Sequence, residues 1–338
     1  MPVVLSGSTF GKCRVTERIV ILDAQTLNPG DLSWAAFHDL GDVSSHDRTP
    51  PSLVVERSTD ATAVITNKVP LDANSIQQLP QLRYIGVTAT GFNIVDVEAA
   101  TAHDVTVSNV PVYGTDSVAQ HTIALMLELA RGIRAHDAAV KQGKWTNGDD
   151  FCLPCGPIIE LCGRTLGIVG LGRIGLSVAR IGQAMGMRII ASGRTAEGPA
   201  TVDGLAVKYV PIDHLFQQAD VVSLHCPLTS ETAEMVNAER LKQMKPTAFL
   251  INTSRGQLID QPALADALGQ NQIAAAALDV LETEPPAKDN SLLSAPRCLI
   301  TPHVAWYAQE ARSRLLAMSA ANLKSFFNGA PQNVVNKK

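Results

Sequence analysis

The sequence is poor in aromatic residues, in cysteine and in net charge. Of its 338 residues, 4% are aromatic and six are cysteine, and the formal net charge is −4. Nucleic acids and anionic membrane surfaces favour a strongly basic protein, so this charge balance argues against both as partners. No apolar run approaches the roughly 20 residues that a membrane-spanning helix needs.

The first residues, MPVVLSGSTFGKCRVTER, contain a short apolar patch but lack the basic segment and long apolar stretch of a secretory signal. We therefore expect a cytoplasmic protein. Six cysteines are too few for a disulfide scaffold in a chain of this length. Cys152, Cys155 and Cys162 lie close in sequence, but a structural zinc site usually takes four ligands in two pairs, and no second pair exists. We expect reduced thiols and no metal site.

Short apolar runs alternate with helix-like stretches through most of the chain. The runs that we predict to be strands are residues 19–22, 63–66, 84–87, 165–169, 188–191, 221–225, 248–252 and 274–279. They are apolar throughout rather than alternating, which is typical of parallel strands covered on both faces. The strand–helix repetition predicts an α/β fold of βαβ units with doubly wound parallel sheets.

One long apolar helix is predicted over residues 117–135, with Asp116 or Ser117 as its N-cap. A helix that is apolar nearly all round is buried, either in a core or against another subunit.

The strongest local motif is G-x-G-x-x-G, formed by Gly170, Gly172 and Gly175. It follows an apolar strand and opens a predicted helix, which is the context of a dinucleotide-binding turn. The first glycine permits the tight turn, the second lets backbone approach a pyrophosphate, and the third lets helix and strand pack closely. The helix N-terminus then offers N–H groups and partial positive charge to the phosphates.

The second strand of this unit ends at Ser192, followed by Arg194. An NAD enzyme usually places an acidic residue here to hold the ribose 2′-hydroxyl. A hydroxyl and a guanidinium would instead accept a 2′-phosphate, which an acid would repel. The residues therefore favour NADP(H) and leave NAD(H) open, with Arg194 then merely solvated.

Three later segments carry polar residues that periodicity does not explain. They are residues 250–256, 277–285 and 299–305, which we place beyond the carboxyl ends of buried strands. Ligands bind at that position in open parallel sheets, so these segments are candidates for the reacting groups.

The sequence resembles the D-2-hydroxyacid dehydrogenase family from about residue 18 to residue 335. The resemblance rests on these segments, the glycine motif, and the motifs TNKV at 66–69, ATGFN at 89–93, DSVAQHT at 116–122 and HCPL at 225–228. Within the family, it is most similar to the glycerate dehydrogenase or hydroxypyruvate reductase branch. The resemblance implies NAD(P)-dependent hydride transfer between a small 2-keto acid, hydroxypyruvate or glyoxylate, and the D-2-hydroxy acid, D-glycerate or glycolate.

The resemblance also implies three catalytic roles. Arg255 corresponds to the arginine that holds the substrate carboxylate, for which a forked, permanently charged guanidinium is suited. His303 corresponds to the acid/base, and Glu284 to the carboxylate that orients it. Taken singly, each could be an ordinary surface, turn or loop residue. Their joint occurrence beside a dinucleotide motif favours the catalytic interpretation.

Further contacts are expected by the same matching. Those to the cofactor are Gly170, Gly172, Arg173, Ile174 and Gly175 at the pyrophosphate, Ser192 and Arg194 at the ribose, Asp279 at the nicotinamide carboxamide, and Thr122, Cys226, Pro227, Thr232 and Thr253 along the cofactor cleft. Those to the substrate are Lys68, Thr90 and Gly91, beside Arg255 and His303.

The resemblance implies two Rossmann-like domains. The substrate domain would be discontinuous, residues 1–114 plus 305–338, with the NAD(P)-binding domain, residues 115–304, inserted into it. Catalysis would take place in the cleft between them. The family is typically dimeric through the cofactor domain, so a homodimer is expected.

Two alternatives stay open. One is a related dehydrogenase for another 2-hydroxy acid, such as D-lactate or phosphoglycerate. The other is a nucleotide-sensing, corepressor-like binding module, since some relatives work in this way and can keep the three catalytic residues.

Overall fold

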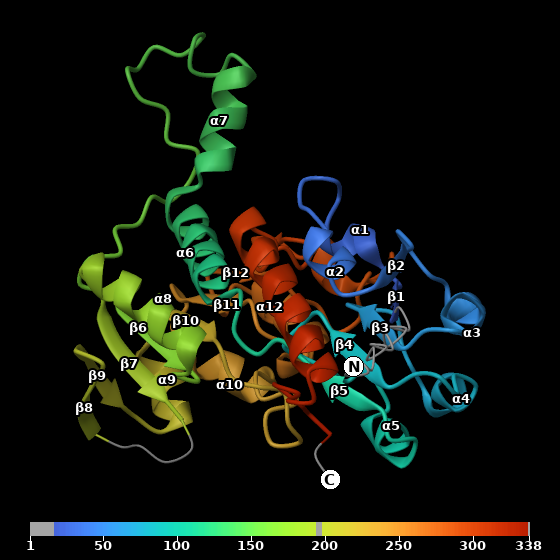
Figure 1. The fold of residues 1–338 in the computed structure, drawn as a ribbon. Coiled ribbons are helices and arrows are strands. Elements are labelled where there is room, and N and C mark those ends of the chain that lie inside the picture. The colour runs from blue at the N-terminus through green and yellow to red at the C-terminus, as the bar shows by residue number, and fades with distance from the viewer. Residues whose placement is uncertain (1–16, 194–197, 337–338) are drawn as a thin grey trace, which may run out of the picture. The chain divides into compact units, whose positions relative to one another are not determined.

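The computed structural model describes residues 17–193 and 198–336, so the first sixteen residues and Arg194 lie outside the described part. The chain divides into two units. Unit 1 comprises Met1–Tyr113 and Gln309–Lys338, and unit 2 is Gly114–Ala308. The sequence analysis placed these boundaries after residues 114 and 304. Each unit has its own sheet (Figure 1).

Among the described residues, five parallel strands form the sheet of unit 1, in the order β2-β1-β3-β4-β5. Because β1 lies between β2 and β3, the strand order reverses between β1 and β3, which is where open sheets of this kind bind ligands. The elements are β1 (Arg18–Ile21), α1 (Ala24–Leu27), α2 (Ala35–His38), β2 (Asp42–Ser45), η1 (Pro51–Leu53), α3 (Val54–Ser58), β3 (Ala63–Thr66), α4 (Ala73–Gln77), β4 (Tyr84–Val87), α5 (Val97–Ala102), β5 (Thr106–Ser108) and α12 (Gln309–Phe327).

The returning helix α12 joins the second section of unit 1 to the first. The rings of Phe326 and Tyr84 lie 4.9 Å apart, and the buried side chain of Asn322 donates a hydrogen bond to the backbone oxygen of Asn109. Unit 1 is therefore one folded body although its chain is discontinuous.

In the described part of unit 2, eight strands form one sheet in the order β13-β12-β11-β10-β6-β7-β9-β8, and only the β8–β9 pair is antiparallel. The elements are α6 (Thr115–Arg131), α7 (Ile133–Lys141), β6 (Thr165–Val169), α8 (Arg173–Ala184), β7 (Arg188–Ser192), β8 (Gly198–Val202), β9 (Leu205–Tyr209), α9 (Ile212–Gln218), β10 (Val221–Leu224), α10 (Ala238–Gln243), β11 (Phe249–Asn252), η2 (Gly256–Leu258), α11 (Gln261–Gly269), β12 (Ala275–Leu278), η3 (Ser291–Leu293) and β13 (Cys298–Ile300).

The central strands of unit 2 are buried on both faces. Phe249 and Ile251 of β11 pack in the apolar cluster under α6 and α8, whereas Leu250 packs in the opposite cluster under α9, α10 and α11. Successive residues of a strand face opposite sides, so a strand covered on both sides must be apolar throughout. The expected α/β class with doubly wound parallel sheets is confirmed.

The predicted helix over residues 117–135 is wrong in its extent. Helix α6 ends at Arg131 because Gly132 adopts the left-handed conformation, with φ 57° and ψ 40°, and α7 begins at Ile133. The expected N-cap is also wrong. Gly114 takes that position, while Asp116 lies in the first helical turn and Ser117 donates a hydrogen bond to the backbone oxygen of Ala305. Within the described residues, every helix is too short or too polar to cross a lipid bilayer.

Candidate active site

The glycine motif lies in the turn between β6 and α8, at the carboxyl end of a central strand. Gly170 has a φ of +91°, and a Cβ there would lie 2.7 Å from the backbone nitrogen of Cys226. A Cβ at Gly175 would lie 2.3 Å from the backbone oxygen of Gly170. At exposed Gly172, an added Cβ would meet nothing within 4 Å. Packing therefore requires Gly170 and Gly175, whereas Gly172 leaves free space in front of α8.

These residues fit a dinucleotide pyrophosphate. Gly172 is the N-cap of α8 and offers no side chain to the free N–H groups of the first turn. Such N–H groups and the positive end of the helix suit a phosphate anion. Arg173 is exposed and Ile174 half-buried at the same turn, so the guanidinium is accessible to a ligand.

Ser192 lies directly beside the glycine turn. It pairs with Val169 in the sheet, and its backbone oxygen accepts a hydrogen bond from the N–H of Gly170 at 3.0 Å. Its side chain is half-buried at the carboxyl end of β7. Ser192 is therefore adjacent to the start of the glycine turn.

The loops after β10 and β11 are joined by hydrogen bonds. The backbone oxygen of buried Cys226 accepts a bond from Ser254 Oγ at 2.8 Å. Burial raises the pKa of the Cys226 thiol, in agreement with a reduced and unreactive group. In the loop after β10, Thr232 donates to the backbone oxygen of Pro227 at 2.7 Å. That hydroxyl therefore closes the loop.

Thr253, in the loop after β11, contacts helix α6. Its hydroxyl lies 2.9 Å from that of Thr122, which is 1% exposed and donates to the backbone oxygen of Val118. Thr122 is thus buried inside unit 2, and its hydroxyl contacts that of Thr253, which is also buried.

A buried asparagine shapes the turn that presents Arg255. The side chain of Asn252 donates to the backbone oxygen of Arg255 at 2.8 Å and accepts from the N–H of Ser254 at 3.0 Å. Arg255 itself is exposed. The next residue, Gly256, lies against the backbone after β12, since a Cβ there would lie 1.9 Å from the carbonyl carbon of Leu281. The Arg255 turn is therefore seated on the segment that leads to Glu284.

Glu284 and His303 form a close pair. His303 Nδ1 lies 2.5 Å from Glu284 Oε2, and the two side chains are 31% and 36% exposed. The other carboxylate oxygen of Glu284 accepts a hydrogen bond from the N–H of Leu281 at 3.0 Å. The carboxylate is thus fixed by the backbone on one side and orients the imidazole on the other.

Asp279 holds the turn that carries His303. Its Oδ1 accepts hydrogen bonds from Thr301 Oγ1 at 2.6 Å and the N–H of Val304 at 2.9 Å, and its Oδ2 accepts from the N–H of Ala305 at 2.9 Å. Burial alone would raise the pKa of Asp279, but the bonds from these groups and from His121 hold it below the usual value. The ionised carboxylate stabilises His303 in a left-handed conformation, φ 54°, that non-glycine residues rarely adopt.

The expected substrate residues of unit 1 lie in two loops after neighbouring strands. Lys68, after β3, and Thr90, after β4, are exposed, and Gly91 is half-buried. Thr90 is fixed at both ends, since its hydroxyl donates to the backbone oxygen of Val110 and its backbone oxygen accepts from the side chain of Asn109.

Three comparisons bear on the family of this chain. Residues 123–305, more than half of the chain, match the model for the D-isomer specific 2-hydroxyacid dehydrogenase, NAD binding domain. The chain is 44% identical to a hydroxypyruvate reductase from Blautia hydrogenotrophica over 95% of its length and 100% of the relative, and 39% identical to a glycerate dehydrogenase from Methylorubrum extorquens over 95% and 99%. The structure matches an NADPH-dependent glyoxylate/hydroxypyruvate reductase from Sinorhizobium meliloti, in complex with NADP and malonate, with TM-score 0.79 and 30% identity over 95% and 97% of the two chains.

The chain belongs to the D-2-hydroxyacid dehydrogenase family. The dehydrogenase is therefore an oxidoreductase that uses a nicotinamide cofactor, and the resemblance seen in the sequence is confirmed. The region that matches the NAD-binding model contains the glycine motif and the residues Arg255, Glu284 and His303.

Two residues that hold candidate site residues in place were not singled out from the sequence. His121 lies 3.1 Å from Thr301 Oγ1 and 3.4 Å from Asp279 Oδ1, behind the His303 turn. Asn252 acts on Arg255 as described above. Both lie within quoted motifs or segments, but their partners become visible only in the folded chain. In the described ranges, no group of three or more His, Cys, Asp or Glu side chains is arranged to hold a metal ion.

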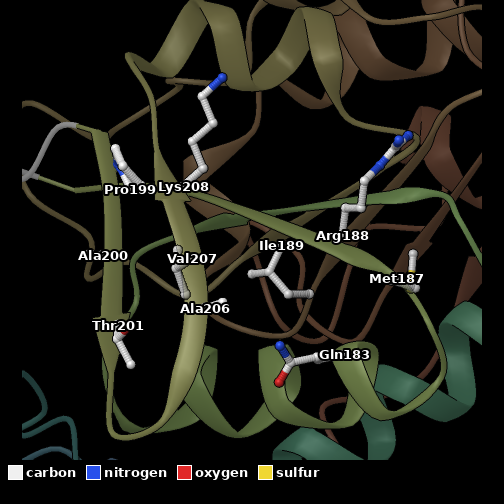
Figure 2. Close-up of a pocket in the computed structure, with 10 residues that line it drawn as sticks. All are labelled: Gln183, Met187, Arg188, Ile189, Pro199, Ala200, Thr201, Ala206, Val207 and Lys208. Atoms are coloured by element: carbon white, nitrogen blue, oxygen red, sulfur yellow. The ribbon is translucent and has the colours of Figure 1, made fainter.

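A hollow of about 650 Å³ lies beside strands β7, β9 and β8, at the edge of the sheet of unit 2 (Figure 2). It is lined by Gln183, by Met187 and by residues of β7, β8 and β9, among them Arg188 at the amino end of β7. Figure 2 shows Arg188 and Lys208 both extending away from Gln183. The glycine turn adjoins the carboxyl end of β7, and none of its residues lines the hollow.

An added methyl group should affect binding at Gly172 but stability at Gly175. Gly172→Ala should leave the melting temperature almost unchanged but weaken NADPH binding about tenfold, or ~1.4 kcal/mol, because the methyl group enters the space that the phosphates need. Gly175→Ala should lower the melting temperature, because its Cβ meets the backbone of Gly170. Calorimetric titration and thermal unfolding measure the two effects.

Gly269→Ala is the matched control, since a Cβ there would also meet nothing within 4 Å and the residue lies at the end of α11. NADPH binding of wild-type strength in Gly172→Ala would show that the phosphates do not approach this turn.

Proposed function

We propose that this dehydrogenase reduces hydroxypyruvate and glyoxylate to D-glycerate and glycolate, with NADPH as the favoured hydride donor, and catalyses the reverse oxidations. The observation that carries the proposal is the Glu284–His303 pair, closed at 2.5 Å on the turn that Asp279 holds. Among similar proteins, those from B. hydrogenotrophica, M. extorquens and S. meliloti bear the names of this activity.

The candidate residues can perform the proton transfer and the substrate binding. A bound nicotinamide cofactor supplies the hydride that reaches the substrate C2 carbon in reduction and accepts it in oxidation. Since Nδ1 of His303 faces Glu284, the proton exchanged with the C2 oxygen is carried at Nε2. In reduction His303 donates that proton, and in oxidation it accepts it, while Glu284 stabilises the imidazolium form.

Arg255 is the proposed carboxylate ligand. Its exposed guanidinium offers several N–H donors in one plane, which matches a carboxylate, and its positive charge also polarises an adjacent carbonyl. In unit 1, we assign the N–H groups of Thr90 and Gly91 and the ammonium of Lys68 to substrate binding as well. Substrates of this kind are small anions, so cationic and N–H donors in both loops are what their recognition needs.

The remaining expected contacts are proposed for the cofactor. Gly170, Gly172, Arg173, Ile174 and Gly175 surround the pyrophosphate, and Ser192 with Arg194 accepts a 2′-phosphate. Cys226, Pro227, Thr232 and Thr253 form the wall, with Thr122 supporting Thr253. Asp279 receives the nicotinamide carboxamide at Oδ2, which accepts one hydrogen bond from the described residues.

The exposed apolar side chains of α7 and the following loop support a homodimer. Ile133, Val140, Trp145 and Phe151 are between 45% and 90% exposed, and Figure 1 shows this segment standing away from the sheet of unit 2. Large apolar side chains exposed along one segment favour burial against a partner. A monomeric mass in light scattering would contradict the dimer.

The exposed thiols of Cys152 and Cys155 are free, which favours a reducing compartment such as the cytoplasm. Recovery of these cysteines from cells in oxidised form would contradict this location.

Initial rates test the proposed function directly. With NADPH, hydroxypyruvate and glyoxylate should turn over with a higher kcat/KM than pyruvate, and each should do better with NADPH than with NADH. Rapid turnover of pyruvate alone would point to a D-lactate type of enzyme. No turnover of any 2-keto acid would reject the proposed reaction.

Ser192→Asp tests the cofactor preference. A carboxylate at this position would repel a 2′-phosphate and accept a ribose hydroxyl, so the ratio of kcat/KM for NADPH over NADH should fall at least tenfold, or by ~1.4 kcal/mol. In the control Ser192→Asn, the new side chain has nearly the size of aspartate but no charge, so the ratio should shift much less. An unchanged ratio in the aspartate variant would contradict the assignment of Ser192 to the 2′ position.

His303→Asn tests the acid/base. It should lower kcat by ~10²–10⁴-fold, the usual range for a lost general acid/base, and leave the NADPH dissociation constant unchanged. His214→Asn, at an exposed position of α9, should behave as wild type. Equal losses of kcat and of NADPH affinity in His303→Asn would mean that the residue supports the fold rather than the proton transfer.

A further inference from the structure

Asp23 occupies the N-cap of α1 but does not cap it. Its side chain makes no hydrogen bond to the first turn, whereas Asp72, Asp96 and Asp260 accept such bonds in α4, α5 and α11. Asp23 follows β1 and is 4% exposed. The carboxylate of a residue that usually serves its own helix is therefore directed elsewhere.

It is directed at the loop after the neighbouring strand β3. The N–H of Asn67 donates to both carboxylate oxygens, at 2.9 and 3.1 Å, and the N–H of Lys68 donates to Oδ2 at 2.6 Å. Strands β1 and β3 are adjacent, and the strand order of the sheet reverses between them. Asp23 thus lies under the point where a doubly wound sheet binds its ligand.

The bonds make carboxylate and loop depend on each other. Burial raises the pKa of Asp23, while hydrogen bonds from the backbone of Asn67, Lys68 and Val69 and the charge of Lys68 act in the opposite direction. An ionised Asp23 therefore requires the N–H groups of this loop. Without the carboxylate, the N–H groups of Asn67 and Lys68 would lose the acceptor that they have here, and the loop would leave its present conformation.

The same loop is connected to the second substrate loop. The side chain of buried Asn67 donates to the backbone oxygen of Thr88, and the N–H of Thr88 donates to the backbone oxygen of Thr66 at 2.8 Å. Thr88 begins the segment that continues to Thr90 and Gly91. The Asp23 carboxylate therefore fixes the loop of Lys68 directly, and it fixes the loop of Thr90 indirectly, through Asn67.

We infer that Asp23 is a positioning residue for the recognition of the substrate carboxylate. It sets the backbone of residues 66–69, which presents Lys68, and through Asn67 it sets the start of the loop that presents the N–H groups of Thr90 and Gly91. The inference rests on the proposed function of those three residues. It assigns a role in substrate affinity to a buried group that itself touches no ligand.

The variant Asp23→Asn tests the inference at nearly constant size. One acceptor oxygen becomes an NH₂ group, which opposes a backbone N–H of the loop, donor against donor. The NADPH-loaded variant should bind malonate, the anion present in the S. meliloti structure, about tenfold more weakly, and its KM for hydroxypyruvate should rise about as much. The dissociation constant for NADPH should stay within about twofold of wild type, because unit 2 is unaltered.

Thr49→Val is the matched control. The buried hydroxyl of Thr49 donates to the backbone oxygen of Leu22, beside Asp23, and makes no bond to residues 66–69. Each variant loses a buried polar interaction close to the end of β1, so both should lower the melting temperature. In hydrogen exchange, the amides of residues 66–69 should exchange faster in Asp23→Asn than in Thr49→Val.

The outcomes separate the inference from the proposed function. Malonate affinity, KM for hydroxypyruvate and amide exchange that match the Thr49→Val control would overturn the role of Asp23. A wild-type enzyme that binds malonate but does not reduce hydroxypyruvate would reject the proposed reaction, while malonate affinity and amide exchange would still decide the role of Asp23. A wild-type enzyme that neither binds malonate nor reduces hydroxypyruvate would overturn both.

Discussion

At Gly170 and at Gly256, no side chain fits between the backbones of two neighbouring loops of unit 2, and the candidate active site depends on this close approach. Gly170 lies against the backbone after β10, and Gly256 lies against the backbone after β12. Parallel strands end at the same edge, so their loops share a small area and meet through the main chain. The glycine turn, the Arg255 turn and the Glu284 turn are thereby placed by backbone contact, which is more rigid than contact between flexible side chains.

The buried strands were the predictable part of the fold. Strands β3, β4 and β6 have the expected bounds because each is apolar throughout and covered on both faces. Strand β2, with the sequence DVSS, is an exposed edge strand and has no apolar run to reveal it. In β9, buried and exposed residues alternate, which is the pattern of an antiparallel hairpin rather than of a central strand. Propensity could not place the break at Gly132 because both flanking segments are good helices.

The candidate reacting groups could be proposed from sequence because they lie in short motifs, but the residues that hold them in place could not. Asp23 and Asn67 are 44 residues apart, and Asp279 and Ala305 are 26 residues apart. Each contact depends on two neighbouring strands ending at the same height in the sheet. Sequence spacing contains no record of that register. The sequence shows the residue types, and a buried aspartate after a strand needs hydrogen-bond donors. Which groups donate to it is decided by the fold.

Both units use the same device, a buried carboxylate that accepts backbone N–H groups of a loop. Asp279 is 1% exposed and Asp23 is 4% exposed, whereas His303 and Glu284 expose about a third of their side chains and Arg255 is exposed. A buried carboxylate is costly unless several donors surround it, so it allows few alternative loop conformations. The side chains proposed to react can then remain accessible to ligands without being disordered. Because buried carboxylates hold the loops and exposed side chains meet the ligand, a residue such as Asp23 can affect substrate affinity without touching the substrate.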